Sequence, residues 1–300
     1  MSGTVPVSEV NPLKTKPTTH AVSVDVEDYF QVWALSEVIK RDDWDVIPLR
    51  VERATKTVLD LFDRTDTKGT FFTLGWVAEK APGLIRDIVS RGHEIASHGY
   101  DHTKIFDQSA EEFRQDIRNT RKILEDISGE RVKGFRAAGF SLDERSPWAH
   151  KILREEGYEY SSSVHPIAHD HYNAPDAPRF ASHPLEDDQG FLEIPVSTTM
   201  LAGRRVSCAG GGWFRAMPYH VSRFLIDRMI HQDNQPAVFY FHPWEVDPEQ
   251  PRVSGLSGKS SLRHYLNLDR MESKLEHLLG GMTWQRMDHV FGVARLEEAA

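Results

Sequence analysis

The hydrophobic residues of the chain fall into two kinds of segment: short apolar blocks, and stretches with helical spacing. Residues 21–26 and 68–74 are short blocks that end beside charged or glycine residues, which is typical of buried strands. Residues 110–128 instead repeat apolar positions at helical spacing, follow a capping box of Ser109 and Glu112, and stop before Gly129. The whole pattern predicts strands at 21–26, 68–74, 94–97, 134–137, 158–164, 191–196 and 237–241, and helices at 51–63, 82–91, 110–128, 147–156, from 218 onward and near 270–279.

The alternation of strands and helices is typical of parallel βαβ units, which either close into a barrel or form an open sheet. Residues 165–190 are rich in Pro, His and Asp, and irregular segments of this length are often functional. The three glycines at 210–212 predict a turn. Because no internal repeat is visible, we expect one α/β domain over residues 20–300, preceded by a flexible tail over residues 1–19.

Composition and charge narrow the function classes. The 300 residues include 36 Lys and Arg against 45 Asp and Glu, and the formal charge of −9 disfavours a nucleic-acid-binding surface. No segment approaches the roughly 20 apolar residues of a membrane span, and no secretion signal is visible, so we expect a cytoplasmic protein without a membrane span. A single cysteine, Cys208, excludes an intramolecular disulfide and a cysteine-built zinc site. Any metal must therefore be held by carboxylates and histidines.

Polar residues follow four of the predicted strands. In parallel α/β folds the loops that leave the carboxyl ends of the strands build the functional site, so we expect these residues to lie together. They are the acidic cluster Asp25, Glu27 and Asp28, the pair His98 and His102, Arg136, and His242.

The acidic cluster and the two histidines together indicate a metal site. His98 and His102 share one face if their segment is a helical turn, and two histidines with one carboxylate leave coordination positions open, as in catalytic zinc sites. Strand alternation points Asp25 and Glu27 to the same side and Asp28 away. One carboxylate can then bind the metal while its neighbour acts as general base. The alternative is a pair of surface histidines and a cluster that only caps a strand or helix.

Arg136 and His242 have two interpretations each. Arg136 lies in a mostly apolar strand, where it needs a carboxylate partner, so it either orients a catalytic aspartate or forms a structural ion pair. His242 lies at a strand end, between an aromatic run and a Pro-Trp pair, where it either protonates a leaving group or serves packing.

These residues belong to motifs that, in this order, resemble those of the polysaccharide deacetylase family, the NodB-homology enzymes of carbohydrate esterase family 4. The likeness covers about residues 20 to 290, and the chain resembles the subgroup found in exopolysaccharide loci associated with exosortase systems. The matching motifs are residues 23–30, 98–102, 135–140 and 239–245, and residues 210–215 and 263–268 are similar to signatures of the subgroup.

The resemblance implies a distorted (β/α) barrel in a single domain, with about residues 245–300 as a subgroup-specific extension. It also implies a divalent metal ion, usually zinc, held by a carboxylate of the first motif and two histidines. Asp25 would be the general base, oriented by Arg136, and His242 the general acid. The implied metal ligands are His98, His102 and Glu27, with Asp28 as the alternative to Glu27.

The sequence departs from the family pattern at several positions. The first motif lacks adjacent aspartates, Ala138 replaces a proline, and Ser161 lies where the family usually has an aspartate that supports the acid histidine. Asp170 is a candidate replacement for that aspartate. The residues that we expect to contact substrate are Phe140, whose neighbouring backbone N–H groups can stabilise an oxyanion, Trp213 and Trp244.

The resemblance implies a hydrolase that removes N-acetyl groups from an amino-sugar glycan. A lipid-linked precursor of exopolysaccharide is an equal candidate, which would place the protein at the cytoplasmic membrane face. One alternative is hydrolysis of another amide, such as a formamide or a cyclic imide, on the same site. A second is a non-catalytic carbohydrate-binding protein, and a third is an iron oxygenase, which would need oxygen and a co-substrate. The oligomeric state is left open.

Overall fold

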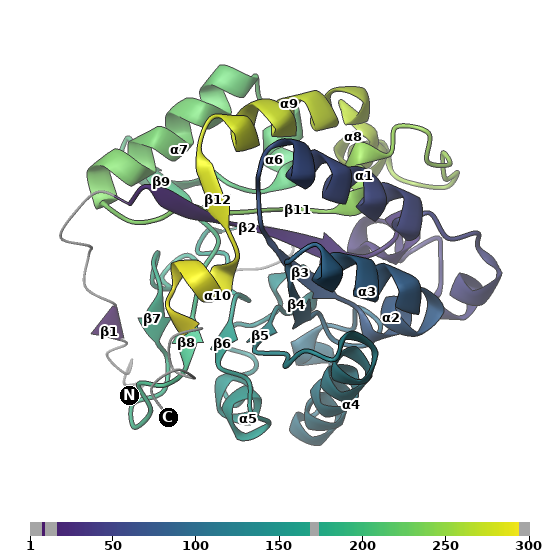
Figure 1. Cartoon of the computed structure of the whole chain (residues 1–300), viewed down its shortest axis with the longest axis horizontal. Helices are drawn as coiled ribbons and strands as arrows, with labels where there is room; N and C mark the ends of the chain where they lie inside the picture. Colours follow the sequence, from purple (N-terminus) through teal and green to yellow (C-terminus); the bar gives the residue numbers. More distant parts are fainter. Residues whose placement is uncertain (1–7, 10–16, 169–173, 294–300) are drawn as a thin grey trace.

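The computed structural model describes residues 8–9, 17–168 and 174–293. Parallel strands form the centre of a 10-stranded sheet in the order β1-β7-β8-β6-β5-β4-β3-β2-β11, with β12 also paired to β2 (Figure 1). The parallel strands are β2 (Thr19–Val26), β3 (Thr70–Thr73), β4 (Glu94–Ser97), β5 (Gly134–Phe135), β6 (Tyr160–Ser161), β8 (Leu192–Glu193), β11 (Val238–Phe241) and β12 (Thr283–Gln285). Two antiparallel strands, β7 (Ser182–His183) and β1 (Ser8–Glu9), extend the β8 edge.

The sheet curls, and an irregular segment links its two ends. After β8 the chain crosses toward β11: the N–H of Ile194 donates to Ser161 O at 2.7 Å, and the N–H of Ser197 donates to Val238 O at 3.2 Å. A hairpin of β9 (Thr198–Leu201) and β10 (Arg204–Ser207) follows. This curled parallel sheet in one domain confirms the predicted distorted (β/α) barrel.

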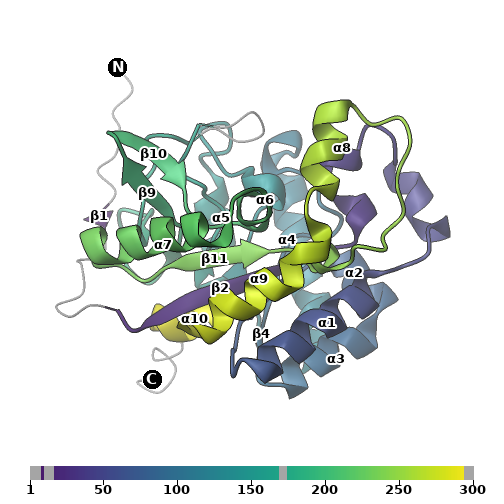
Figure 2. The same ribbon diagram turned by 90° about the horizontal axis from the view of Figure 1, so that it is seen from above.

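Helices surround the sheet on its outside, as the two orthogonal views show (Figures 1 and 2). They are α1 (Val51–Arg64), α2 (Gly75–Lys80), α3 (Pro82–Ser90), α4 (Ala110–Ser128), α5 (Ala149–Glu155), α6 (Gly211–Ala216), α7 (Tyr219–Asp233), α8 (Gly258–Tyr265), α9 (Leu268–Gly280) and α10 (Met287–Val290). Short 3-10 segments occur in the loops: η1 (Tyr29–Gln31), η2 (Trp33–Leu35), η3 (Arg41–Val46), η4 (Ile105–Asp107), η5 (Ala138–Phe140) and η6 (Pro243–Val246).

Helix α4 shows how local sequence sets an element. Ser109 accepts a hydrogen bond from the N–H of Glu112, whose side chain accepts one from the N–H of Ser109, so the predicted capping box is confirmed. Gly129 ends the helix with a φ of 73°, a conformation that glycine adopts without steric cost. The apolar stripe, which includes Phe113, Ile117 and Leu124, is buried in the main core.

The turn predicted at residues 210–212 is wrong, because Gly211 begins helix α6. A Cβ atom on Gly211 would lie 1.9 Å from Glu245 Oε1, so this glycine allows a close approach of α6 to a buried carboxylate. The predicted strands at 134–137, 158–164 and 191–196 each shorten to two residues in the sheet.

The predicted tail lies mostly outside the described residues. Within it, Ser8 and Glu9 pair with β7, and β2 begins at Thr19. In the described parts of the chain, no helix combines the length and apolar character that crossing a bilayer requires.

Candidate active site

The carboxyl ends of neighbouring strands carry the predicted site residues. Asp25 lies near the end of β2 and Glu27 directly follows it, while His98, Arg136 and His242 follow β4, β5 and β11. Strand β2 pairs with β3 on one side and with β11 on the other, and β4 and β5 continue the sheet beyond β3. Contacts described below join all five side chains, so the strand ends form one cluster, as predicted.

Glu27, His98 and His102 form a candidate metal site. One ligand atom from each lies within 4.8 Å of the others. His98 Nδ1 lies 2.8 Å from the carbonyl oxygen of Arg136, which can only accept a hydrogen bond. Nδ1 therefore carries the proton, and the lone pair of Nε2 is left for a metal.

The buried oxygen Oε2 of Glu27 also fits a bound cation. It accepts no hydrogen bond, although His102 Nε2 lies 3.0 Å from it. Buried carboxylate oxygens are normally hydrogen-bonded, and a metal ion bound by both this oxygen and the imidazole nitrogen would satisfy the two groups. The chemistry of the donors therefore fits a divalent metal, without specifying which one.

The loop between the two histidines differs from the predicted helical turn. Gly99 and His102 have positive φ values of 74° and 63°, so the segment is an irregular loop. The N–H of Tyr100 donates to Asp116 Oδ1 on α4 at 2.8 Å, which holds the loop in place. The imidazoles still meet edge to face with ring centroids 5.4 Å apart. The two imidazoles lie close together, as predicted, but an irregular loop and not a helical turn brings them together.

The charges around the cluster are set by burial and by neighbouring groups. Burial alone raises the pKa of Glu27, but the interactions with His102, His242 and His98 outweigh burial and lower this pKa to about 2. Burial lowers the pKa of His98 to about 4, so this imidazole is neutral near pH 7. An ionised carboxylate and a neutral imidazole are the forms that ligate metals.

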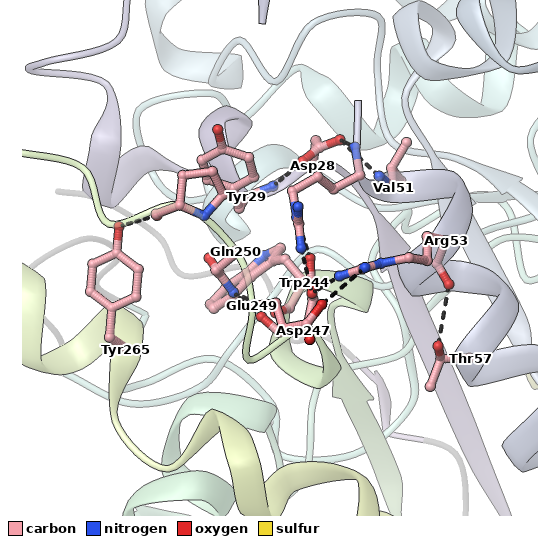
Figure 3. Close-up of polar contacts among 12 residues, drawn as sticks. Asp28, Tyr29, Val51, Arg53, Thr57, Trp244, Asp247, Glu249, Gln250 and Tyr265 are labelled. Atoms are coloured by element: carbon pink, nitrogen blue, oxygen red, sulfur yellow. Dashed lines mark hydrogen bonds and ion pairs between the residues drawn. The ribbon is translucent and has the colours of Figure 1, made fainter. Parts of the chain in front are cut away.

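Asp28 has a separate, structural position. Its carboxylate accepts hydrogen bonds from the backbone N–H groups of Tyr29, Arg50 and Val51, at 2.8, 2.6 and 2.8 Å. It therefore caps η1 and the first turn of α1, as Figure 3 shows for Tyr29 and Val51. Burial raises the pKa of Asp28 to about 6 despite these bonds. Of the two carboxylates left open by the sequence, Glu27 is the one that lies with the histidines.

Asp25 is held by a buried guanidinium. Arg136 Nη1 donates to Asp25 Oδ1 at 2.6 Å and to the hydroxyl of Ser23 at 2.8 Å. The other side of the guanidinium binds Ser162, with Nη2 donating to its hydroxyl at 2.8 Å and Nε donating to its carbonyl at 3.0 Å. Arg136 is fully buried, so the four bonds fix its position and leave the second oxygen of Asp25 directed at the site.

His242 lies close to the carboxylates of both Asp25 and Glu27. Its Nε2 lies 3.9 Å from Asp25 Oδ2 and 3.4 Å from Glu27 Oε1. Burial lowers the pKa of His242, but the hydrogen bond with Glu245 and the negative charges of Glu27, Glu245 and Asp25 outweigh burial and raise this pKa to about 9. The imidazole is thus a proton donor at neutral pH in the protein without bound metal.

Sequence reasoning missed Glu245 as a partner of this histidine. Glu245 Oε1 lies 2.8 Å from His242 Nδ1, and Oε2 accepts a hydrogen bond from Arg215 Nε at 2.6 Å. The signal was present as a His and a Glu three residues apart, a spacing that brings side chains together in a helical turn such as η6. The other candidate, Asp170, lies outside the described residues. Ser161 donates instead to the hydroxyl of Ser163 at 2.7 Å.

The three predicted substrate contacts lie in different surroundings. Phe140 is buried against Tyr240, with ring centroids 4.9 Å apart, and its own N–H donates to Ala137 O at 3.1 Å. That N–H is therefore already engaged. Trp213 on α6 is 44% exposed and can stack on a sugar.

Trp244 is buried, between two imidazole rings. Its ring stacks on His242 at 5.2 Å between centroids and on His264 at 4.4 Å, with small interplanar angles of 23° and 14°. Both indole faces are thus covered, and Nε1 donates to Glu27 Oε1 at 3.4 Å. Trp244 therefore packs against His242, contacts Glu27 and has little indole surface left for a sugar.

Fold and site together define a barrel with a candidate metal centre at the carboxyl ends of its strands. The family model described as polysaccharide deacetylase matches residues 42–161, and a model described as a domain of unknown function, DUF3473, matches residues 162–292. The chain thus contains a polysaccharide deacetylase domain, followed by DUF3473. His98, His102 and Arg136 lie in the first match, whereas His242 and Glu245 lie in the second.

Known proteins of similar sequence match only part of the chain. A peptidoglycan-N-acetylglucosamine deacetylase from Bacillus cereus is 34% identical over 96 residues, which is 32% of this chain and 35% of the relative. A protein of the same description from Listeria monocytogenes is 37% identical over 75 residues, which is 25% of this chain and 16% of the relative. The matched segments thus span about a third of the first relative's length and less of the second.

Solved structures share the fold over most of the chain. A Mycobacterium smegmatis protein assigned to the polysaccharide deacetylases has a TM-score of 0.62 and 16% identity, covering 98% of this chain and 96% of that one. An allantoinase has a TM-score of 0.57 and 16% identity, covering 91% of this chain and 88% of that one. At these identities the similarity shows the fold alone.

Proposed function

We propose that this protein is a metal-dependent carbohydrate N-deacetylase. The single observation that carries the proposal is the arrangement at the carboxyl ends of the strands. A cluster of two histidines and one carboxylate lies beside an aspartate bound to a buried arginine and a histidine paired with a second carboxylate. Amide hydrolysis needs an activated water, a base and an acid, and these groups supply all three.

Glu27, His98 and His102 would hold the metal ion, for which zinc is the best candidate given the nitrogen and oxygen donors. When bound, the ion polarises the acetyl carbonyl and makes a water molecule a better nucleophile. Glu27 is kept close to the histidines by the indole N–H of Trp244. His98 is oriented by the carbonyl of Arg136, so the ligands are held before the metal arrives.

Asp25 and His242 would carry the two proton transfers. Asp25 takes a proton from the attacking water, and Arg136 holds the carboxylate in position for this step. The water oxygen forms a bond to the acetyl carbon, and the carbon–nitrogen bond then breaks. His242 gives its Nε2 proton to the departing nitrogen, because an unprotonated amide anion is a poor leaving group. The products are acetate and the free amino sugar.

The substrate class follows from the relatives and from the sequence resemblance. The names of the two relatives support an N-acetylated amino sugar as substrate. We propose, more narrowly, a glycan or a lipid-linked precursor in exopolysaccharide assembly, which the subgroup signatures at residues 210–215 and 263–268 support. The cytoplasmic location expected from the sequence stays a prediction.

The proposal is tested by measuring acetate release from N-acetylglucosamine oligomers and from lipid-linked acetamido sugars. The protein is assayed after chelation and again after zinc is restored, beside an Asp25→Asn control. Release that depends on zinc and is lost in the control supports the proposal. A panel that includes N-formyl sugars and cyclic imides identifies the alternative amide substrates. Glycan binding without hydrolysis of any of them would contradict an enzymatic role.

A further inference from the structure

The ring nitrogen of His242 that points away from the carboxylates of the site has its own partner. Glu245 Oε1 lies 2.8 Å from His242 Nδ1 and also accepts the backbone N–H of His242 at 3.1 Å. Glu245 is fully buried. A carboxylate is an acceptor when ionised, so Nδ1 must be the donor of this hydrogen bond. The bond therefore fixes both the tautomer and the rotation of the imidazole, with Nε2 facing Asp25 and Glu27.

Arg215 fixes Glu245 in turn. Its Nε donates to Glu245 Oε2 at 2.6 Å, and both side chains are buried. The two terminal nitrogens bind backbone carbonyls of the last turn of α8 and of the residue after it: Nη1 donates to His264 O and Leu266 O, and Nη2 donates to Arg263 O, at 3.1, 2.6 and 3.2 Å. A guanidinium held by four bonds cannot turn away, so Glu245 has one stable position.

Helix α6, which carries Arg215, lies close to the buried Glu245. Gly211, one residue into the helix, leaves the space in which Glu245 lies, because a Cβ atom there would be 2.5 Å from the carboxylate carbon as well as 1.9 Å from Oε1. The glycine-rich segment and the segment at residues 263–268, both outside the resemblance to the general family, thus meet at the ion pair of Arg215 and Glu245. Packing alone would not require a buried ion pair at this point, because such pairs contribute little net stability.

We propose that Glu245 and Arg215 are positioning residues for His242: Glu245 holds a proton on Nδ1, so that the doubly protonated ring can give up its Nε2 proton, and Arg215 fixes Glu245. The inference rests on the proposed function of His242 as a proton donor. It assigns a role to the part of the chain matched by the domain of unknown function. That part supplies the acid together with its orientation, while the deacetylase match supplies the two histidines of the metal site.

The substitution Glu245→Gln separates this role from packing, because it keeps the shape of the side chain. Arg215 can only donate, so the new amide oxygen turns toward the guanidinium and the amide NH2 turns toward Nδ1 and the backbone N–H of His242, which loses its acceptor. The imidazole must then accept at Nδ1, so the doubly protonated ring that gives up its Nε2 proton is no longer stabilised. Replacing Arg215 by Gln in the same chain removes this constraint, because a second amide can donate or accept and lets the first one turn back.

The experiment compares wild type, Glu245→Gln, the double variant Glu245→Gln/Arg215→Gln and the control Glu94→Gln. The control changes another buried glutamate, at the opposite ends of the strands. We expect Glu245→Gln to lower kcat by roughly 10- to 100-fold with little change in KM, as supporting residues of a site commonly do. We expect the double variant to recover part of the loss, and the control to keep its kcat. A kcat for Glu245→Gln near that of the control would overturn the proposal.

A measurement that does not depend on enzymatic activity distinguishes the positioning role of Glu245 from the proposed function of the protein. Nitrogen-15 NMR of the histidine rings, assigned with His242→Gln, reports which ring nitrogen of His242 carries the proton. We expect protonated Nδ1 in the wild type and unprotonated Nδ1 in Glu245→Gln. An unprotonated Nδ1 in the wild type overturns the positioning role, even if Glu245→Gln fails to fold. Protonated Nδ1 in a wild type that releases no acetate would leave the positioning role standing and reject the proposed function.

Discussion

Two buried glutamates lie at opposite ends of the barrel, and their pKa values move in opposite directions. Glu27, at the carboxyl ends of the strands, has a pKa lowered to about 2. Glu94, at the beginning of β4, has a pKa raised to about 8, mainly by burial and then by the nearby charge of Asp288. Burial opposes the charged form of both side chains, so the difference must come from their partners.

The partners show what each end of the barrel is built to do. Glu94 accepts hydrogen bonds from the hydroxyls of Thr70 and Tyr160, at 2.5 and 3.0 Å, and from the backbone of Asp288 on α10. These contacts join the C-terminal helix to the strands and are satisfied without any added group. Glu27 is surrounded by imidazoles and keeps one oxygen without a hydrogen bond. The contacts of Glu94 therefore serve packing at one end of the barrel, whereas the oxygen of Glu27 without a hydrogen bond can bind a cation.

The largest effect is expected for Asp25→Asn. The amide cannot take a proton from water, so turnover should fall by roughly 100- to 10,000-fold, the usual range for a catalytic base. Because Asp25 is bound to Arg136 rather than to the histidines, metal content should stay near that of the wild type. Acetate release and bound metal are measured on the same sample. Retained turnover would remove Asp25 from the reaction.

Substitutions of Glu27 and Asp28 test which of these two carboxylates binds the metal and which one caps α1. Changes to residues that only orient a metal ligand cost about 10- to 100-fold in metal affinity, so Glu27→Gln, which removes a ligand, should cost at least about 100-fold. Asp28→Asn should leave metal affinity unchanged and lower the free energy of unfolding by about 1–3 kcal/mol, because a buried N–H loses its acceptor. Metal titration and thermal unfolding of both variants give the answer. The reverse pattern would make Asp28 the ligand.

A smaller effect is expected at Trp213, the exposed aromatic residue on α6. Loss of a stacking platform removes binding that substrate and transition state share, so Trp213→Ala should raise KM by roughly 3- to 10-fold with kcat little changed. Trp213→Phe, which keeps an aromatic face, is the matched control and should recover most of the affinity. An unchanged KM in the alanine variant would place the glycan elsewhere.

The smallest effect is expected for the pH dependence of stability in Glu94→Gln, at the end of the barrel opposite the candidate active site. Because the fold raises the pKa of Glu94, the folded protein binds its proton more tightly than the unfolded chain. The contribution of this group is most favourable below pH 4.5 and is lost as the pH rises through about 8. Glu94→Gln cannot ionise, so its stability relative to wild type should increase over this pH range. Denaturant unfolding at several pH values measures the slope, and a flat difference would show that Glu94 is not protonated in the fold.

The sequence predicted those features that depend on local spacing. The caps of α4, the alternation of side chains along β2 and the position of polar residues after strands each follow from a few neighbouring residues. They were enough to predict parallel βαβ units and to place Asp25 and Glu27 on one side, whereas the barrel was implied by the family resemblance. The proximity of His98 and His102 was also predicted, although the loop that produces it depends on Gly99 and on a contact with Asp116 from α4.

Features that depend on distant segments were missed. Gly211 looks like a turn residue in the sequence, and only the folded chain shows that it makes room for Glu245. The role of Trp244 depends on two imidazoles, of which His264 lies 20 residues further along the chain and stacks at 4.4 Å. Such contacts are decided by packing between elements, which a periodic pattern does not record.

The central claim is that one metal ion binds between Glu27, His98 and His102. Calorimetric titration of the chelated protein with zinc tests it directly, with the His98→Ala/His102→Ala variant and the Glu94→Gln control measured beside it. The account predicts one zinc ion per chain in wild type and control, and none bound tightly by the double variant. Zinc binding of equal affinity and stoichiometry in the double variant would contradict it.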